Sequence, residues 1–454
     1  MKRLMQLLLC YTVLITTLYS CRSDEDMLNV YPAGSNEQVN QWMLKTMQKY
    51  YLWTDKIPSQ TNLNQNPKDY FKSLLSKDDK FSVAIKKDDP ETIPQSVRSL
   101  FGFDFAVLQQ QNQLTFAIVK LVMEDSPAKR AGLQRGDIIT EINQIKVSRE
   151  NADRIIEEVS RSRTISLRLA QLKDNQLIFQ RSLEIQAMLN FSQPLQSQIL
   201  DVNSNKVGYL YIADFQDGLA SSLTKQFQDF KRQNISHLIL DLRYNGGGSV
   251  SSAAALCALI TDKLKSGTPF IVYKGNKNGG TVNHSVDQAF ANGNQSMSFE
   301  ALKTSALALP EIYIITSANT ASAAEVVINN LKPYIKVIQI GEKTLGKDMA
   351  AFTLSDTETP DNKWIIYPMV YKIFNILDAG NYTSGIEPTL TADEYEHLPL
   401  QALGNKDETL LSAALLVITG QKSSNLKTKS LTRNTVFRVL AESEKPINFI
   451  KIPL

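Results

Sequence analysis

Cysteine is scarce in this chain of 454 residues, and its scarcity excludes a fold that is stabilised by several disulfides. The three cysteines are Cys10, Cys21 and Cys257. The first two lie in an N-terminal segment with the features of an export signal, so Cys257 has no partner for a disulfide in the mature chain. Cys257 lies in the apolar run of residues 253–260, and we expect it to be a small core residue.

Histidine is equally scarce, and no grouping of residues suggests a metal site. His237, His284 and His397 are far apart in the sequence, and no spacing of histidine, cysteine and glutamate is typical of zinc ligands. His237 begins an apolar run that predicts a buried strand, and the other two lie in polar segments. We therefore expect no metal and no cofactor, and we do not favour a histidine as catalytic base.

The chain also lacks an excess of charge of either sign. It has 49 Lys and Arg against 46 Asp and Glu, a formal net charge of +3, which gives no electrostatic reason to expect a nucleic-acid partner or binding to a membrane surface. Hydrophobic residues make up 43% and charged residues 21%, as in ordinary globular proteins. The length is sufficient for about three domains.

The N-terminus is typical of an export signal. Met1-Lys2-Arg3 is basic, and the apolar stretch after it is too short for a transmembrane helix. Leu18-Tyr19-Ser20-Cys21 resembles a bacterial lipobox, which implies a signal peptide at residues 1–20, lipidation of Cys21 and a flexible tether at residues 21–34. An ordinary signal peptide with an incidental cysteine is the alternative.

The residues after Cys21 bear on the location of the protein. Arg22-Ser23-Asp24-Glu25-Asp26 is acidic and resembles the acidic export tag of some Bacteroidetes lipoproteins, which implies an outer-membrane lipoprotein on the cell surface. A lipoprotein that faces the periplasm is the alternative. In both cases we expect the protein in the cell envelope, attached to the membrane through the lipid on Cys21.

A small helical domain is predicted over residues 35–95. Ser35 and Gln38 have the spacing of a helix capping box, and apolar residues then recur at helical spacing through Tyr50. Residues 96–190 differ, because they combine short strand-like runs with turns that contain glycine. This change of pattern predicts a second domain.

The second domain contains two segments that resemble a PDZ domain. The loop Phe101-Gly102-Phe103 enters a predicted strand, and Ser126–Ile139 has the pattern of a turn, a short helix, a turn and a strand. The resemblance implies that the loop offers backbone N–H groups to the carboxylate of a peptide C-terminus, and that the strand edge pairs with the peptide. Ile155 on the following helix would line the groove. A PDZ-like domain that only packs or gates is the alternative.

Residues 191–454 alternate strand-like apolar runs with helices, which predicts βαβ units and a mostly parallel sheet. The expected strands are Val207–Ile212, His237–Leu242, Glu311–Ile315, Ile335–Ile340 and Trp364–Tyr371, and the expected helices are Leu219–Lys231, Val250–Ile260, Ser322–Leu331 and Lys406–Thr419. The fold class is therefore a multidomain α/β (α+β) protein.

Ser322 and Lys347 are the strongest candidates for chemistry. Ser322 follows a predicted strand and a turn of small residues at the point where a helix begins, which can expose a nucleophile. Lys347 lies 347 − 322 = 25 positions later, in a turn that contains glycine. A serine hydroxyl needs a partner to take its proton, and a desolvated, neutral lysine can do this. Without other signals, Ser322 is equally explained as a helix N-cap.

Three blocks around these residues resemble the C-terminal processing peptidases, the tail-specific serine endopeptidases of family S41. The blocks are Thr320–Glu325, Gly341–Lys347 and Asp241–Gly248, and their order and spacing, together with the PDZ-like segment, carry the resemblance. It implies a small helical N-terminal domain, a PDZ-like β domain and a crotonase/ClpP-like catalytic core.

The resemblance also implies a role for each residue of the site. Ser322 would be the nucleophile, and Lys347 would be the general base and later the general acid. The amides of Gly247 and Ala323 would form the oxyanion hole, where fixed N–H groups stabilise the developing negative charge. Glu325 would organise the site. A plain turn or a phosphate-binding loop is the alternative for Gly247, but the chain lacks the lysine of a Walker motif.

Lys347 can act as a base near neutral pH only if burial lowers its pKa. We expect Asp348, its neighbour in an extended segment, to face the opposite side, and we expect Lys343 to be a solvated surface charge.

Many family members have a glutamine four residues after the lysine that orients the amine, but this chain has Ala351. Arg181 is implied to couple the PDZ-like domain to the core, as a similarly placed arginine does in relatives.

We predict a serine endopeptidase that captures protein C-termini and hydrolyses envelope or extracellular proteins through an acyl-enzyme on Ser322. Its expected partners are protein or peptide substrates and no nucleic acid, and the oligomeric state stays open. The alternative is a catalytically inactive lipoprotein that binds peptides, which the substitution at Ala351 favours. A third hypothesis is that the protein is an enzyme that processes itself, or an enzyme that is held inactive until a partner moves the PDZ domain.

Overall fold

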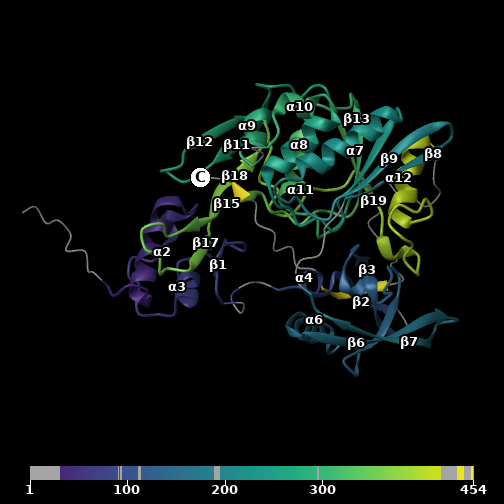
Figure 1. Ribbon diagram of the computed structural model, residues 1–454, viewed down its shortest axis with the longest axis horizontal. Coiled ribbons are helices and arrows are strands. Elements are labelled where there is room, and N and C mark those ends of the chain that lie inside the picture. Colours follow the sequence, from purple (N-terminus) through teal and green to yellow (C-terminus); the bar gives the residue numbers. More distant parts are fainter. Residues whose placement is uncertain are drawn as a thin grey trace, which may run out of the picture.

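A computed structural model gives the structure of the protein. It describes residues 31–89, 92, 95–110, 114–188, 195–293, 296–420 and 437–443, and the backbone of 451–452. The signal peptide and the lipidation site predicted at Cys21 lie outside the described residues. The N-terminal domain and the PDZ-like domain lie at two separate places on the same side of a larger core (Figure 1). In the part of the chain that the structure describes, no helix is long and apolar enough to cross a membrane.

The N-terminal domain is helical and is joined to the core by a small sheet. Its elements are α2 (Asn36–Tyr50), η2 (Thr54–Lys56), α3 (Pro67–Ser73) and β1 (Val83–Lys86). Helix α2 begins at Ser35, whose hydroxyl accepts a hydrogen bond from the Gln38 N–H, whereas the Gln38 side chain accepts from Gly34 instead of closing the capping box. Strand β1 pairs antiparallel with β17 (Trp364–Tyr367), which in turn pairs with β16 (Leu354–Ser355).

The PDZ-like domain is an antiparallel sheet with three helices. Its elements are α4 (Val97–Phe101), β2 (Phe103–Gln110), β3 (Thr115–Val122), α5 (Pro127–Arg130), β4 (Ile138–Ile142), β5 (Ile145–Lys146), α6 (Ala152–Arg161), β6 (Thr164–Lys173) and β7 (Gln176–Gln186). The strand order is β20-β2-β3-β4-β6-β7. The outermost strand, β20 (Phe437–Glu442), comes from the C-terminal part of the chain, and sequence analysis did not predict it.

The core is built on a six-stranded sheet in the order β19-β14-β13-β10-β9-β8. The strands are β8 (Gln196–Val202), β9 (Asn205–Tyr211), β10 (His237–Asp241), β13 (Glu311–Thr316), β14 (Lys336–Gly341) and β19 (Leu390–Thr391). All neighbours are parallel except β8 and β9. The predicted mostly parallel sheet is therefore confirmed.

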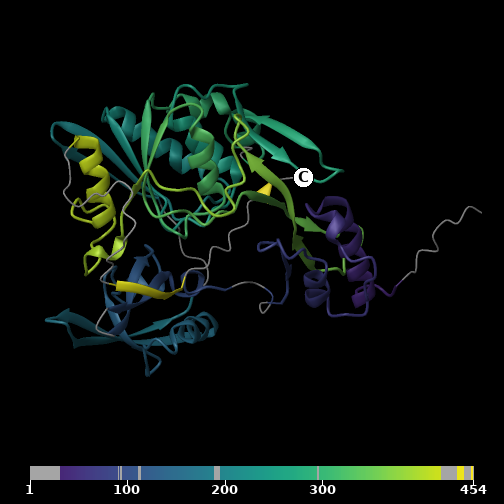
Figure 2. The same ribbon diagram turned by 180° about the vertical axis from the view of Figure 1, so that it is seen from behind.

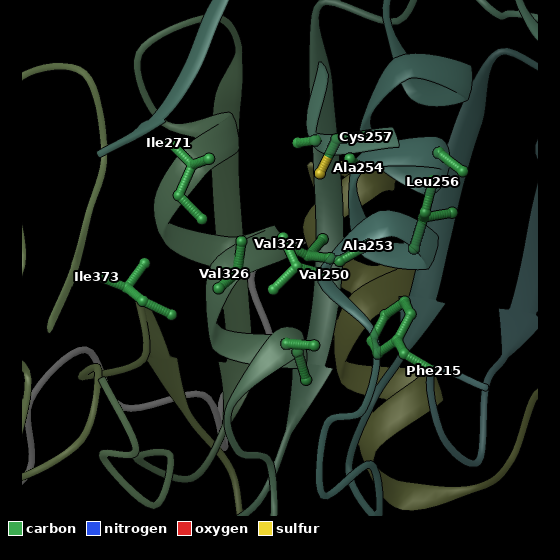
Figure 3. Packing of buried hydrophobic residues seen from close by; sticks show 14 of the residues in the cluster. Phe215, Val250, Ala253, Ala254, Leu256, Cys257, Ile271, Val326, Val327 and Ile373 are labelled. Carbon is green, nitrogen blue, oxygen red and sulfur yellow. The ribbon is translucent and has the colours of Figure 1, made fainter. Parts of the chain in front are cut away.

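Helices cover both faces of this sheet, so its strands are buried on both sides. In β10, Leu238 and Leu240 face a cluster with α7 (Ala220–Arg232), α8 (Val250–Ile260) and α11 (Ala323–Leu331), while Ile239 faces α12 (Thr409–Thr419). Helix α8 packs against α11, and Cys257 lies beside Ala254 in this packing (Figure 3). Cys257 is fully buried and unbonded, as predicted for a core residue.

A second, five-stranded sheet has the order β12-β11-β18-β15-β21. Its strands and the remaining short elements are β11 (Pro269–Lys274), β12 (Thr281–Ser285), α9 (Val286–Ala291), α10 (Phe299–Lys303), β15 (Met349–Phe352), β18 (Met369–Phe374), η3 (Glu394–Glu396) and β21 (Lys451–Ile452). The prediction of a single strand at Trp364–Tyr371 is wrong. The chain divides at Pro368 into β17 and β18, because proline has no N–H to donate to a ladder.

Candidate active site

The turn before α11 holds Ser322 in a strained conformation. Its φ is 65° and its ψ is −121°, a region that costs a non-glycine residue about 1–3 kcal/mol. The Ala321 N–H donates to the Asn245 carbonyl at 3.0 Å, and the Thr320 hydroxyl donates to the Leu242 carbonyl at 2.8 Å. The loop after β10 therefore fixes the turn. Ser322 is fully buried, and its Oγ makes no hydrogen bond within the described residues.

Gly247 lies directly against Ser322. Its φ is 104°, and a Cβ on it would lie 2.4 Å from the Ser322 Cβ and 2.7 Å from the Ser322 Oγ. The Gly247 backbone thus lies beside the candidate nucleophile. The Gly247 N–H, however, donates to the Asn245 side-chain oxygen at 2.8 Å, so this amide is engaged in the present state. Ala323 is the first residue of α11, and its N–H has no acceptor within the helix.

Lys347 lies in the loop between β14 and β15, with an exposed fraction of 2%. Burial lowers its pKa to about 7, although the negative charges of Glu325 and Asp79 act in the opposite direction. Its Nζ lies 5.3 Å from the centre of the Phe81 ring. Phe81 and Asp79 belong to the loop before β1, so the N-terminal domain contributes to the surroundings of the candidate base.

Glu325 joins the two candidate residues through their backbone. Its Oε2 accepts the N–H groups of Ser322 and Lys347, both at 2.8 Å. Its Oε1 accepts the Gly346 N–H at 2.7 Å and the Thr344 hydroxyl at 2.5 Å. Burial raises the pKa of Glu325 to about 7, and the four hydrogen bonds act in the opposite direction. This buried carboxylate therefore links the turn at Ser322 to the loop at Lys347, in a chain that has Ala351 four residues after the lysine.

The charged neighbours of Lys347 are paired elsewhere. Asp348 receives two hydrogen bonds from the Lys372 Nζ, at 2.8 and 3.0 Å, so its carboxylate faces another partner, as expected. Lys343 is half-exposed and lies 3.5 Å from Glu387, which agrees with a surface charge. Among the described residues, no group of three or more His, Cys, Asp or Glu side chains could hold a metal ion.

Sequence reasoning missed two residues of the site. Asn245 precedes the glycine triplet and holds the Gly247 amide, and an asparagine before glycines is itself a turn signal that could have drawn attention to it. Phe81 is 347 − 81 = 266 positions from Lys347. No local pattern in the sequence connects residues so far apart, so its place beside the lysine could not be predicted.

The predicted peptide-binding residues of the PDZ-like domain converge. Phe101 ends α4, Phe103 begins β2, and both rings share an apolar cluster with Ile155 of α6 and Ala441 of β20. Gly102 has a φ of 76° and its N–H donates to the Arg98 carbonyl at 2.9 Å. This amide therefore ends the helix and is not free for a ligand carboxylate in the present state.

The predicted coupling through Arg181 is wrong. Arg181 lies on β7, an edge strand of its sheet, and bonds Asp137 and the Gly132 carbonyl within its own domain. Arg135 is one of the residues of this domain that bond to the core. Its guanidinium donates to Glu394 at 2.7 Å and to the Tyr244 hydroxyl at 2.6 Å.

Comparisons with known proteins agree with this geometry. Residues 206–392 match the family model of peptidase family S41, residues 38–83 match the peptidase S41 N-terminal domain, and residues 118–170 match a PDZ domain. A probable CtpA-like serine protease of Staphylococcus epidermidis is 26% identical over 69% of this chain and 57% of its own length. One from Staphylococcus aureus is 25% identical over 72% of this chain and 60% of its own length.

The chain thus spans about three fifths of the length of these relatives. A solved structure from Bacteroides fragilis, of the S41 protease type, is 27% identical, with a TM-score of 0.69 over 84% of this chain and 98% of that chain. By the matches to its core, its N-terminal domain and its PDZ segment, the chain therefore belongs to peptidase family S41.

Proposed function

We propose that the chain is a serine endopeptidase in which Ser322 attacks the substrate carbonyl and Lys347 accepts the serine proton. One observation carries the proposal: the Glu325 carboxylate links a strained serine turn to a buried lysine whose pKa is lowered to about 7. A lysine with this pKa is partly neutral at physiological pH and can serve as a general base.

The reaction follows from these roles. The Ser322 Oγ bonds to the carbonyl carbon as its proton moves to the Lys347 Nζ, and the Ala323 amide stabilises the oxyanion. The protonated Lys347 then gives its proton to the leaving amine, which leaves an ester on Ser322. Lys347 then takes a proton from water as the hydroxide adds to the ester carbonyl. The bond between the acyl carbon and the Ser322 Oγ breaks as Lys347 returns this proton to that oxygen, which releases the carboxylic acid product and restores the free serine and the neutral lysine.

The present state is closed, so the mechanism requires an opening step. Ser322 is fully buried, and the Gly247 amide is held by Asn245. A substrate carbonyl oxygen has to replace the Asn245 oxygen before this amide can serve as the second oxyanion donor. Such rearrangements are common in enzymes that complete their site only when substrate binds.

The test is cleavage of casein, an unstructured protein, by the purified protein and its Ser322→Ala and Lys347→Ala variants. We expect cleavage by the parent alone, with unchanged circular dichroism in both variants. Equal cleavage by all three proteins would contradict the proposed residues. No cleavage by any would support the second candidate, a binding protein without catalysis, which Ala351 and the engaged Gly247 amide favour.

We further propose that the PDZ-like domain captures the C-termini of envelope or extracellular proteins, and that lipidation of Cys21 anchors the protein in the outer membrane. The apolar cluster of Phe101, Phe103 and Ile155 supports a peptide site, and the lipobox-like sequence supports the anchor. Labelling of cells with an alkyne fatty acid tests the anchor, because the label should be lost in Cys21→Ser.

A further inference from the structure

The peptide-binding edge of the PDZ-like domain is already occupied by the chain itself. Strand β20 pairs antiparallel with β2, with Ala441 opposite Val107 and Val439 opposite Leu108, and α6 packs against it. A PDZ domain binds a peptide by adding it as a strand at this kind of edge. Figure 2 shows the C-terminal strand in yellow lying along the blue strands of the domain.

The direction of β20 is that of a peptide ligand. Phe437 lies opposite Gln110 at the far end of β2, and the strand runs from there toward the loop at Gly102. At the near end, the Ser443 N–H donates to the Phe105 carbonyl at 2.9 Å, and the Phe105 N–H donates to the Ser443 hydroxyl at 2.8 Å. The C-terminal end of the strand therefore lies where the last residues of a bound peptide would lie.

The side chains of β20 fill the groove. Ala441 is 8% exposed and belongs to the same apolar cluster as Phe105 of β2 and Ile155 of α6, with Leu440 packed against it. Val439, two residues earlier, is 39% exposed. The groove thus holds a small apolar side chain at the position of Ala441 and leaves Val439 in contact with solvent.

Glu442 connects this strand to the catalytic core. Its carboxylate accepts hydrogen bonds from Lys120 of β3 at 2.8 Å, from Asn319 at 2.7 Å and from Tyr395 at 3.1 Å. Asn319 lies in the loop that leads to Ser322. One carboxylate of β20 is therefore bonded both to the PDZ-like domain and to the nucleophile loop.

The C-terminal part of the chain also reaches the strand that follows the candidate base. Lys451 and Ile452 of β21 lie opposite Ala351 and Phe352 of β15. Because β15 begins two residues after Lys347, the same C-terminal region pairs with both the peptide groove and the base strand.

We propose that β20 is a tethered occupant of the peptide groove, and that a substrate C-terminus binds there only when β20 leaves. The competing ligand is an extended peptide with a small apolar residue at the position of Ala441 and a carboxylate that faces Lys120. The inference rests on the proposed function, because it takes this groove as the capture site. A tethered segment competes at an effective concentration of about millimolar, which a weakly bound peptide does not overcome.

The test measures binding in the Ser322→Ala background, so that catalysis does not contribute. The probe is the peptide Phe437–Ser443 with a fluorescent N-terminus and a free C-terminal carboxylate, followed by anisotropy. Ala441→Asp places a charge in the apolar cluster and should release β20, so we expect it to bind the probe at least about tenfold more tightly than the parent. Val439→Asp is the matched control at an exposed position of the same strand, and its binding should stay near that of the parent.

A second variant locks the strand in place. Gln109→Cys with Arg438→Cys places two thiols on residues that lie opposite each other, and Cys257 is buried and does not interfere. The oxidised form should not bind the probe, and reduction should restore the parent level.

Two results would overturn the proposal. Equal probe binding by the parent and by Ala441→Asp would mean that β20 does not occupy the groove in solution, while capture of C-termini would still stand. No binding by any variant, with release of β20 in Ala441→Asp shown by hydrogen exchange, would mean that the groove is not a peptide site. The casein assay decides catalysis separately in both cases.

Discussion

At the scale of single residues, the pKa of Lys347 sets the pH range in which the proposed base can work. The amine accepts a proton only when it is neutral, which is above its pKa of about 7. Glu325, whose pKa is also about 7, is ionised above the same pH, and only then can it accept all four of its hydrogen bonds. Both changes favour activity as the pH rises.

We therefore expect kcat/KM for casein cleavage to rise with pH through about 7 and to level off above about 8, with a fall of at least tenfold per unit below the midpoint. The measurement is a rate profile between pH of about 5 and about 9, with circular dichroism at each pH to show that the protein stays folded. A rate that does not change between pH of about 6 and about 8 would argue against Lys347 as the base.

The strain at Ser322 gives a second prediction at this scale. A positive φ suits glycine and is unfavourable for any residue with a Cβ. Ser322→Gly should therefore relieve the strain, whereas Ser322→Ala should keep it. We expect the glycine variant to have a free energy of unfolding about 1 kcal/mol larger than the alanine variant, with no activity in either. Urea unfolding of the two inactive variants checks this, and a less stable glycine variant would show that the conformation is not strained.

At the scale of secondary-structure elements, the loop after β10 and the start of α11 are in close contact at the site. A Cβ on Gly247 would lie 2.4 Å from Ser322, whereas a Cβ on Gly267 would meet no atom within 4 Å, although its φ of 78° is also positive. Both glycine-to-alanine changes introduce backbone strain, but only the first also forces the nucleophile turn to move.

Gly267→Ala should cost about 1–2 kcal/mol of stability and leave the activity unchanged. Gly247→Ala should cost more, because the clash with Ser322 adds to the strain, and it should abolish cleavage of casein. Thermal unfolding and the casein assay measure the two effects. Equal loss of activity in both variants would mean that strain alone, and not the contact with Ser322, determines the result.

Which elements could be predicted from the sequence depends on whether their signal is local. Strand β10 is predictable because its alternate residues are apolar toward both helix layers, and α8 because it is a continuous apolar run. Strand β20 could not be predicted, because Phe437–Glu442 pairs with β2, which lies more than 300 positions earlier in the sequence. A short run of mixed apolar and polar residues does not indicate which strand it pairs with. The division at Pro368 had a local signal, but the apolar residues on both sides outweighed it in the prediction.

The same limit applies to the site. Ser322 and Lys347 could be proposed because each lies in a recognisable turn after a strand. The bonds of Glu325 to the loop at Gly346 depend on how β13 and β14 lie side by side, and the place of Phe81 depends on the packing of a separate domain. These contacts follow from the tertiary structure, and no spacing in the sequence encodes them.

At the scale of the whole molecule, a buried network of charges joins the PDZ-like domain to the core. Arg243 is fully buried and bonds Asp241 at 2.9 Å, Glu394 at 3.0 Å and Glu408 at 2.6 Å, and Arg135 reaches the same Glu394 from the PDZ-like domain. Burial acts to raise the pKa of Glu394, but the positive charges of Arg135 and Arg243 outweigh it and lower the pKa to about 2. The network therefore depends on both arginines.

Removal of one arginine from this network tests how firmly the two domains are held together. Arg135→Met keeps the length of the side chain but leaves Glu394 with one cation fewer in a buried place, so we expect a loss of about 3–5 kcal/mol. Arg181→Met is the matched control, because Arg181 is half-exposed and its ion pair with Asp137 stays within one domain; its cost should be below about 1 kcal/mol. Urea unfolding at neutral pH measures both.

The penalty of Arg135→Met should also depend on pH. The folded-state pKa of Glu394 is lowered to about 2, so the ion pairs of its carboxylate stabilise the protein above the unfolded-state pKa of about 4.3 and are lost as the pH falls toward about 2. The difference in stability between the parent and Arg135→Met should therefore shrink between pH of about 7 and about 3. A penalty that is equal at both pH values, or equal in Arg135→Met and Arg181→Met, would mean that Arg135 contributes packing alone and that the charge network does not hold the PDZ-like domain on the core.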